Sequence, residues 1–205
     1  MTDYFKEDNY WKKHINDALE FDNWIDEYID YLPLNCKVLD LGCGRGEYSK
    51  YLIDKGYDVI SADISDIALS KVKTFNKNII KLDMRDLLPF EDNKFDIVFA
   101  NLSIHYFNEL ETKNLINEIH RILKNGGILI GTVNSIDALD FINDHVVEID
   151  KHFYQSYNRQ VRLFDEGDID YYFNNFYKLK VEKRTNTRFG NRKDYILFLF
   201  KKWKL

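Results

Sequence analysis

The stretch Val38-Leu39-Asp40-Leu41-Gly42-Cys43-Gly44-Arg45-Gly46 decides the fold of this chain. A short apolar run ends beside an acidic residue, and three glycines at alternate positions lead into a helical pattern. Glycines at this spacing allow a tight turn and let a ligand approach the main chain, because no Cβ stands in the way. The stretch therefore predicts a buried strand, a ligand-binding turn and a helix.

The glycine loop departs from a dinucleotide site. Such a site holds a pyrophosphate on helix N-terminal amides and has glycine at the third position of G-x-G-x-x-G. Here that position is Glu47, and Asp40 precedes the loop, so carboxylates surround the place where phosphates would lie. The charges favour a ligand that carries an ammonium and a sulfonium group and no phosphate. S-adenosylmethionine (SAM) has this chemistry.

Short apolar runs alternate with amphipathic stretches up to about residue 134. Ser65 is suited to cap one of the amphipathic helices. Apolar strands joined by helices form a parallel sheet that helices cover on both faces. The pattern predicts strands over residues 38–41, 57–62, 78–82, 95–100 and 127–133, and helices over about 47–55 and 108–123, the second stopped by Asn125-Gly126.

The two ends of the chain do not follow this alternation. Residues 8–31 predict one or two amphipathic helices, which end at Pro33. After residue 134 an aromatic-rich connection over 135–164 leads to an expected helix over 165–174. Residues 178–184 and 193–200 then alternate as a final antiparallel hairpin.

Five segments resemble, in order and spacing, the motifs of the class I SAM-dependent methyltransferases. They are residues 40–46, Asp63 in 61–65, Asp83-Met84, 95–102 and 123–130, and the resemblance spans about 36–134. It implies an α/β three-layer sandwich around a Rossmann-like, mostly parallel seven-stranded sheet with a C-terminal antiparallel hairpin. We expect one methyltransferase domain over 1–205, with the N-terminal helices of 1–33 as a lid and 135–164 as an insertion on the substrate side.

The resemblance also implies SAM as cofactor and S-adenosylhomocysteine (SAH) as product. In this family the residue at Asp63 accepts both ribose hydroxyls, that at Asp83 lies near the adenine amine, and that at Met84 lies beside the ring. The lid is expected to contribute two aromatic residues. The implied cofactor-binding residues are Asp40, Gly42, Cys43, Gly44, Gly46, Asp63, Ile64, Asp83, Met84, Asn101 and Leu102, with Tyr10 and Trp11 from the lid.

Catalytic candidates lie just beyond the fourth expected strand. A general base is needed only where the nucleophile must lose a proton. His105 and Tyr106 are the candidates, although His105 fits a pocket wall or a structural residue as well. The tetrad Asn101-Leu102-Ser103-Ile104 differs from the N-P-P-aromatic tetrad of the related enzymes that methylate base or glutamine amines. We therefore expect a small-molecule methyl acceptor, whose nucleophilic atom stays open.

Composition limits the other possibilities. The net charge of −5 and the absence of an 18-residue apolar stretch predict no nucleic-acid partner and no membrane span, and two cysteines fit a cytoplasmic protein. Two alternatives remain: a SAM-fold binding module without catalysis, and an RNA methyltransferase that uses the basic hairpin, where residues 178–205 hold ten Lys or Arg and two acids. Monomer and homodimer stay open. His145, Glu148, Asp150 and His152 have the side chains of metal ligands, but residues 148, 150 and 152 would share one face only on a strand, so no metal is expected.

Overall fold

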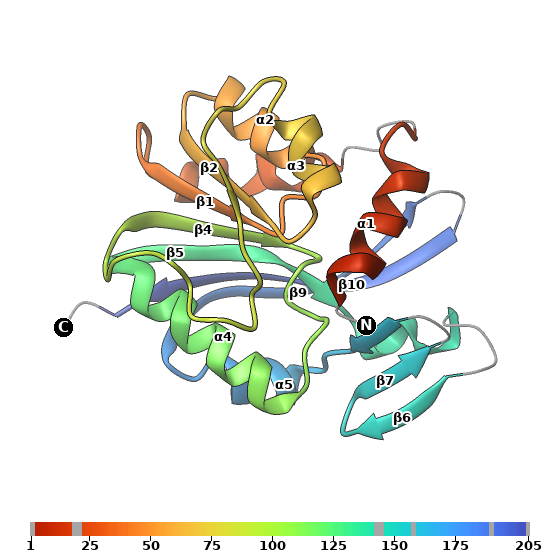
Figure 1. The fold of residues 1–205 in the computed structure, drawn as a ribbon. Helices are drawn as coiled ribbons and strands as arrows, with labels where there is room; N and C mark the ends of the chain where they lie inside the picture. Colours follow the sequence, from red (N-terminus) through yellow and green to blue (C-terminus); the bar gives the residue numbers. More distant parts are fainter. Residues whose placement is uncertain (1–2, 18–21, 142–145, 157–158, 189–190, 204–205) are drawn as a thin grey trace.

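Helices cover both faces of a seven-stranded sheet in the computed structural model, which describes residues 3–17, 22–141, 146–156, 159–188 and 191–203 (Figure 1). The sheet strands are β1 (Lys37–Leu41), β2 (Asp58–Asp63), β3 (Ile79–Lys81), β4 (Phe95–Asn101), β5 (Leu123–Asn134), β9 (Phe176–Arg188) and β10 (Asn191–Lys202). The helices are α1 (Asp3–His14), α2 (Glu47–Asp54), α3 (Asp66–Val72), α4 (Glu109–Ile122) and α5 (Glu166–Tyr172), with the 3-10 helices η1 (Asn23–Tyr31) and η2 (Ile136–Phe141).

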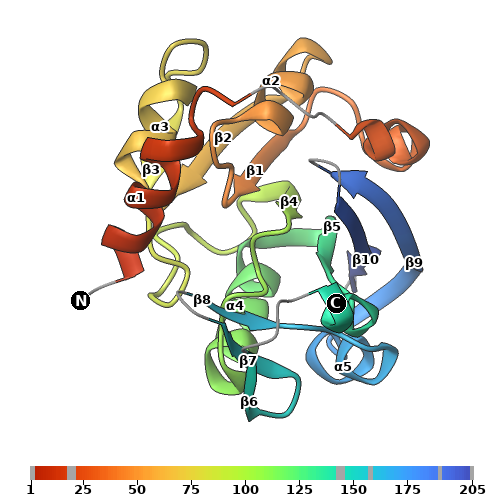
Figure 2. The same cartoon turned by 90° about the vertical axis from the view of Figure 1, so that its right-hand side faces the viewer.

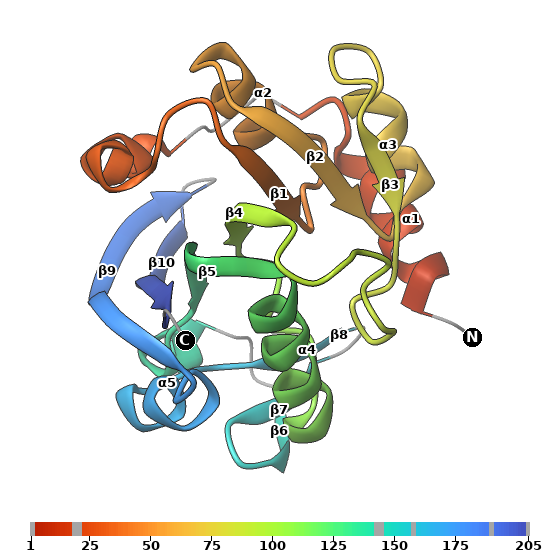
Figure 3. The same ribbon diagram turned by 90° about the vertical axis from the view of Figure 1, so that its left-hand side faces the viewer.

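The strand order is β3-β2-β1-β4-β5-β10-β9, which confirms the predicted fold class. Strand β1 pairs in parallel with β2 and β4, and β5 pairs in parallel with β4. Strand β10 is antiparallel to both β5 and β9, so β9 forms the outer edge of the sheet (Figure 3). The order reverses between β1 and β4, and ligands bind beyond the carboxyl ends of the strands at such a reversal.

Two apolar layers follow from the alternation of side chains along the strands. In β4, Phe99 faces one layer, where it stacks on Trp24 of η1 with ring centroids 5.7 Å apart. Its neighbour Val98 faces the opposite layer, which contains the buried face of α4. Burial of each large apolar side chain contributes about 1.5–3 kcal/mol, so these layers hold the strand ends in place.

Helix α4 ends one residue before its predicted end at residue 123, and β5 begins four residues before its predicted start at residue 127. A capping box of Asn108 and Glu111 begins it, and it ends at Ile122. Strand β5 starts at the next residue, Leu123, which pairs with Phe95 of β4. The prediction that Asn125-Gly126 stops the helix was wrong, because the backbone already pairs with β4 at Leu123, before that turn.

The N-terminal segment 1–33 divides into two parts. Helix α1 lies beside α3 (Figures 1 and 2), at the end of the sheet where the parallel strands have their carboxyl ends. Helix η1 instead packs on the sheet face, where Trp24, Ile25 and Tyr28 are buried. Only the first part therefore occupies the position expected of a lid.

The connection over 135–164 has more structure than its sequence predicts. It contains η2 and a small sheet of β6 (Val147–Asp150), β7 (Phe153–Ser156) and β8 (Arg159–Arg162), in the order β6-β7-β8. This small sheet lies at the same end of the main sheet as α1 (Figures 1 and 2). Strand β6 has the alternating sequence Val147-Glu148-Ile149-Asp150, yet it is exposed along its length. Within the described ranges, no helix has the length and apolarity that crossing a membrane requires.

Candidate cofactor and acceptor site

The glycine loop joins β1 to α2 in left-handed backbone conformations. The φ angles of Gly42, Gly44 and Gly46 are 77°, 55° and 86°. A Cβ on Gly44 would stand 2.8 Å from Cζ2 of Trp11, and one on Gly42 would overlap Ser103. The loop therefore requires glycine for its conformation and for close approach, as its sequence indicates.

Asp63 connects the end of β2 to this loop. Its carboxylate accepts hydrogen bonds from the backbone N–H groups of Gly44, at 2.8 Å, and Ser65, at 2.9 Å. Burial raises the pKa of Asp63, and these backbone hydrogen bonds act in the opposite direction. Two predicted cofactor residues from separate motifs are thus in direct contact.

Asp40 lies deeper, at the end of β1. One of its oxygens accepts a hydrogen bond from Ser49 Oγ at 2.6 Å, and Ser49 in turn bonds Ser61 at 2.7 Å. Burial, aided by the negative charges of Asp63 and Glu47, raises the pKa of Asp40 to about 7. A positively charged ligand would favour the ionised form of this carboxyl group.

The expected adenine end of the site contains an ion pair. Arg85 donates Nε–H to both oxygens of Asp83, at 2.9 and 3.1 Å, and its backbone N–H donates to the same carboxylate at 3.0 Å. Burial alone would raise the pKa of Asp83, but the hydrogen bonds from Arg85 outweigh it and lower the pKa. Met84 reaches back to the glycine loop, where its Cε would stand 2.9 Å from a Cβ on Gly42.

Helix α1 is fastened over the glycine loop at its middle and at its C-terminal end. The carboxylate of Asp8 accepts hydrogen bonds from Ser65 Oγ and from the backbone N–H of Ile67. At the C-terminal end the buried Arg45 donates to the carbonyl oxygens of His14, at 3.0 Å, and Asp17, at 2.7 Å. Because Arg45 belongs to the loop itself, the position of the helix is tied to that of the cofactor residues.

A cavity of about 990 Å³ joins these parts. Each predicted cofactor residue except Gly46 lines it, including Ile64, Asn101, Leu102, Tyr10 and Cys43. Gly46 instead begins α2, where a Cβ would meet Phe75 and Val72. The cavity extends to Ala138, Arg159, Gln160 and Leu163 of the 135–164 insertion, which the sequence predicts on the substrate side. It also extends to residues that sequence reasoning did not find: Thr132, Asn134, Asn186, Thr187, Arg192, Lys193 and Tyr195.

Comparison with known proteins agrees with this geometry. Residues 39–131 match the family profile described as a methyltransferase domain. A SAM-dependent methyltransferase from Methanosarcina mazei has the same fold, with a TM-score of 0.77 at 20% identity over 87% of this chain and 98% of that one. Residues 39–131 of this chain form a class I SAM-dependent methyltransferase domain.

Relatives of this methyltransferase domain carry different names. The human mitochondrial protein named arginine-hydroxylase NDUFAF5 is 38% identical over 111 residues, which is 53% of this chain and 32% of that protein. The uncharacterized methyltransferase sll0829 of Synechocystis is 34% identical over 93 residues, 45% of this chain and 44% of that one. The chain thus spans a third to a half of the length of these curated relatives. Among solved structures, the 1,6-didemethyltoxoflavin-N1-methyltransferase of Burkholderia thailandensis, with bound 1,6-didemethyltoxoflavin and SAH, has a TM-score of 0.74 at 16% identity over 98% of this chain and 86% of that one.

The two catalytic candidates of the methyltransferase differ in position. Tyr106 lines the cavity with 36% of its surface exposed, and desolvation by the surrounding protein raises its pKa to about 12. His105 is 2% exposed and is absent from the cavity wall, and within the described part of the chain its Nδ1 has no hydrogen-bond partner. Burial, and then the charges of Lys193 and Arg159, hold the pKa of His105 far below its usual value. Its role as a base stays a prediction.

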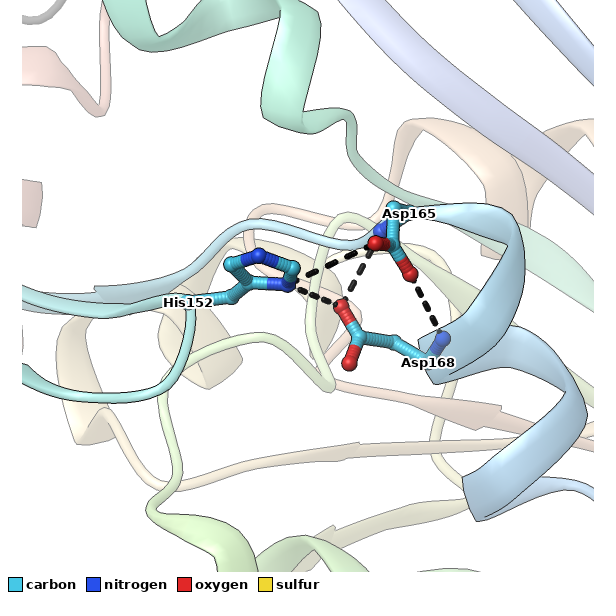
Figure 4. A group of neighbouring side chains, drawn as sticks. All are labelled: His152, Asp165 and Asp168. Carbon is cyan, nitrogen blue, oxygen red and sulfur yellow. Dashed lines mark hydrogen bonds and ion pairs between the residues drawn. The ribbon is translucent and has the colours of Figure 1, made fainter.

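A second group of ionisable side chains lies outside the cavity of the methyltransferase. His152 Nδ1 is 2.6 Å from Asp168 Oδ2 and 3.9 Å from Asp165 Oδ2 (Figure 4). The two aspartates already form the capping box that begins α5. The group therefore joins the small sheet to α5, and its oxygens are engaged as helix caps. Of the residues that the sequence suggested as ligands, His145 lies outside the described ranges, and Glu148 accepts a hydrogen bond from the backbone N–H of His152.

Proposed function

We propose that this chain transfers a methyl group from SAM to a small-molecule acceptor, and that the two bind at opposite ends of the 990 Å³ cavity. The supporting observation is the continuity of this cavity. Its wall runs from the glycine loop and Asp63 to side chains of the 135–164 insertion and the C-terminal hairpin. Such an arrangement suits a reaction in which two ligands must meet.

Methyl transfer is an in-line displacement. The bond between methyl carbon and sulfur breaks, a bond from the acceptor atom to carbon forms, and the electron pair of the broken bond stays on sulfur. Holding the reacting atoms in line supplies about 7–11 kcal/mol of the barrier reduction. Bound SAM would supply the activated methyl group, and the task of this chain is alignment and exclusion of water.

We assign the alignment to the residues around the glycine loop. Asp63 would hold the ribose hydroxyls, because a carboxylate forms charge-assisted hydrogen bonds with them. The loop at Gly42 and Gly44 would border the methionine part, since both glycines line the cavity. Tyr10 and Trp11 would cover the cofactor from α1 and exclude water.

The RNA alternative has less support. Five of the ten cations at residues 178–205 have acidic partners in the described part of the chain; Lys183 pairs with Asp137 at 3.0 Å, Arg184 with Glu27 at 2.6 Å, and Arg192 with Asp194 at 3.0 Å. A phosphate backbone needs cations whose charge is available to it. Salt-sensitive RNA binding that depends on Lys183 would restore this alternative.

The cytoplasm is our proposed setting, because Cys36 and Cys43 are both buried free thiols. The alternative of a SAM-fold binding module without catalysis differs from the proposal only in that it would not convert SAM to SAH.

Turnover of methyl-labelled SAM tests the proposal. The wild-type chain is incubated with labelled SAM and fractions of a small-metabolite extract, and SAH and labelled products are measured by mass spectrometry. We expect SAH and a labelled product from at least one fraction, and neither from Asp63→Asn under the same conditions. SAH binding without turnover in every fraction would favour the binding module, and a hydroxylated product would favour the activity named for the human relative.

A further inference from the structure

The side chain of Arg45 turns from the glycine loop toward the C-terminal end of helix α1. Its Nη1 donates to the backbone carbonyl oxygens of His14, at 3.0 Å, Asp17, at 2.7 Å, and Ile15, at 3.5 Å. The last carbonyl groups of a helix have no partner within the helix, and a cation beside them opposes the negative end of the helix dipole. Arg45 therefore caps α1 from a segment that is distant in the sequence.

The guanidinium of Arg45 is also held from a second side. Glu47, the first residue of α2, accepts a hydrogen bond from its Nε–H. Arg45 is 7% exposed, so water competes little for these bonds. Because a guanidinium presents its donors in a rigid plane, bonds on two sides hold it in one orientation. The bonds thus fix how far the end of α1 lies from the glycine loop.

The cap at Arg45 determines where the aromatic side chains of α1 lie. Trp11 precedes His14 by about one turn, and a Cβ on Gly44 would stand 2.8 Å from its ring. The ring of Tyr10 lies 4.5 Å from that of His14, measured between centroids. Both Tyr10 and Trp11 line the cavity. The residue that follows Gly44 therefore positions the helix that covers this part of the loop.

The middle of α1 has a separate attachment. Asp8 accepts hydrogen bonds from Ser65 Oγ and from the backbone N–H of Ile67, both at the start of α3. This attachment does not involve the glycine loop. Loss of the bonds from Arg45 would therefore free the C-terminal half of α1, which carries Trp11, and leave the middle of the helix in place.

We propose that Arg45 is a positioning residue that holds α1 closed over the bound cofactor and thereby sets how long the cofactor stays bound. The inference rests on the proposed function, in which Tyr10 and Trp11 cover the cofactor, and deepens it by naming the residue that holds this cover. Without the bonds from Arg45, the C-terminal half of α1 opens more often. A bound ligand then leaves faster, and its entry is no slower.

The exchange rate of bound SAH tests this role. Tritiated SAH is bound to the wild-type chain, its dissociation is followed after addition of excess unlabelled SAH, and rapid mixing gives the association rate. We expect Arg45→Gln to raise the dissociation rate at least about tenfold without lowering the association rate, because charged hydrogen bonds to α1 are lost. Hydrogen exchange of the α1 amides should become faster, and that of the α4 amides should stay unchanged.

Two further variants separate the bonds from the charge. Arg45→Lys keeps the charge but not the planar set of donors, and should give a dissociation rate between those of the wild type and Arg45→Gln. Lys13→Gln removes an equal charge from the exposed last turn of α1, outside the cavity wall. Its rates should stay within about twofold of the wild type.

A double-mutant cycle with Trp11→Ala distinguishes a positioning residue from a direct ligand contact. If Arg45 acts through α1, Arg45→Gln should raise the dissociation rate of Trp11→Ala by less than about twofold. A residue that binds the ligand itself would raise it by the same factor as in the wild type. Circular dichroism and urea unfolding check each variant, and Arg45→Lys replaces Arg45→Gln in the cycle if the latter does not fold.

Two results would overturn the role of Arg45 alone: a dissociation rate that Arg45→Gln leaves unchanged, or effects of Arg45 and Trp11 that multiply in full. Failure of SAH to bind the wild-type chain would instead overturn the proposed function.

Discussion

Protonation of Asp40 should control cofactor affinity near neutral pH. Its pKa is raised from 3.8 to about 7, mainly by burial. A ligand with an ammonium group favours the ionised carboxylate, so binding should release a proton from Asp40. The ionised fraction of a group with pKa 7 rises from about 10% at pH 6 to about 90% at pH 8. If SAH binds the ionised form, its affinity should rise about tenfold over this interval, or about 1.4 kcal/mol.

Titration calorimetry of SAH at pH 6, 7 and 8 measures this effect directly. Repeating the pH 7 titration in two buffers of different ionisation enthalpy counts the proton released. Asp40→Asn keeps the acceptor for Ser49 but cannot ionise, so its SAH affinity should be weaker and independent of pH. His14 also lines the cavity, and His14→Gln should therefore keep the pH dependence of the wild type. A flat wild-type profile, or an Asp40→Asn profile that still rises, would refute the reasoning.

The same carboxyl group makes the stability of the cofactor-free protein depend on pH. Because its pKa is higher in the folded state, the unfolded chain releases this proton first as the pH rises. Asp40 therefore does not lower the free energy of unfolding below about pH 4. Between pH 4 and 7 it lowers this free energy increasingly, toward an upper bound of about 4 kcal/mol. Asp40→Asn should gain stability over the wild type across this window in urea unfolding. An equal stability difference between Asp40→Asn and the wild type at pH 4 and pH 8 would contradict this prediction.

Two further predictions use matched pairs of residues. A Cβ at Gly44 meets Trp11, whereas one at Gly56, which also has a positive φ, meets nothing within 4 Å. Gly44→Ala should therefore lower SAH affinity at least tenfold in calorimetry. Gly56→Ala should cost about 1–2 kcal/mol of stability and leave SAH affinity unchanged. Equal SAH affinities of the two variants would contradict the assignment of the loop. Trp24 is 4% exposed and Trp203 is 55% exposed. Trp24→Ala should cost about 3–5 kcal/mol in urea unfolding, and Trp203→Ala less than about 0.5 kcal/mol, whereas similar losses would disprove the account of the η1 layer.

The cofactor end could be predicted from the sequence because local chemistry marks it. The loop needs positive φ angles at every second residue, and this requirement appears in the sequence as three alternating glycines. Asp63 is recognisable because it comes at the end of an apolar run. The acceptor end leaves none. Lys193 reaches the cavity because β10 pairs with the distant β5, and Arg159 because β8 bonds the segment after β4, where the Arg162 N–H donates to the His105 carbonyl. No short pattern records such neighbours.

The direction in which side chains point explains the remaining differences between the sequence predictions and the structure. His105 and Tyr106 are adjacent in sequence, yet only Tyr106 lines the cavity. Outside regular strands and helices no period tells which of two neighbours faces inward. Helix η1 was grouped with α1 because both are amphipathic, and amphipathicity predicts that a face is buried without saying against what.

Thermal unfolding with SAM, SAH and NAD in parallel tests the central claim most directly. A ligand at 100 times its dissociation constant adds about 2.7 kcal/mol of stability, or about 5–10 °C in melting temperature for a domain of this size. The account predicts this shift with SAM and SAH, none with NAD, and none with any of the three for Asp63→Asn. A wild-type chain that is stabilised by NAD, or by none of the three, would contradict it.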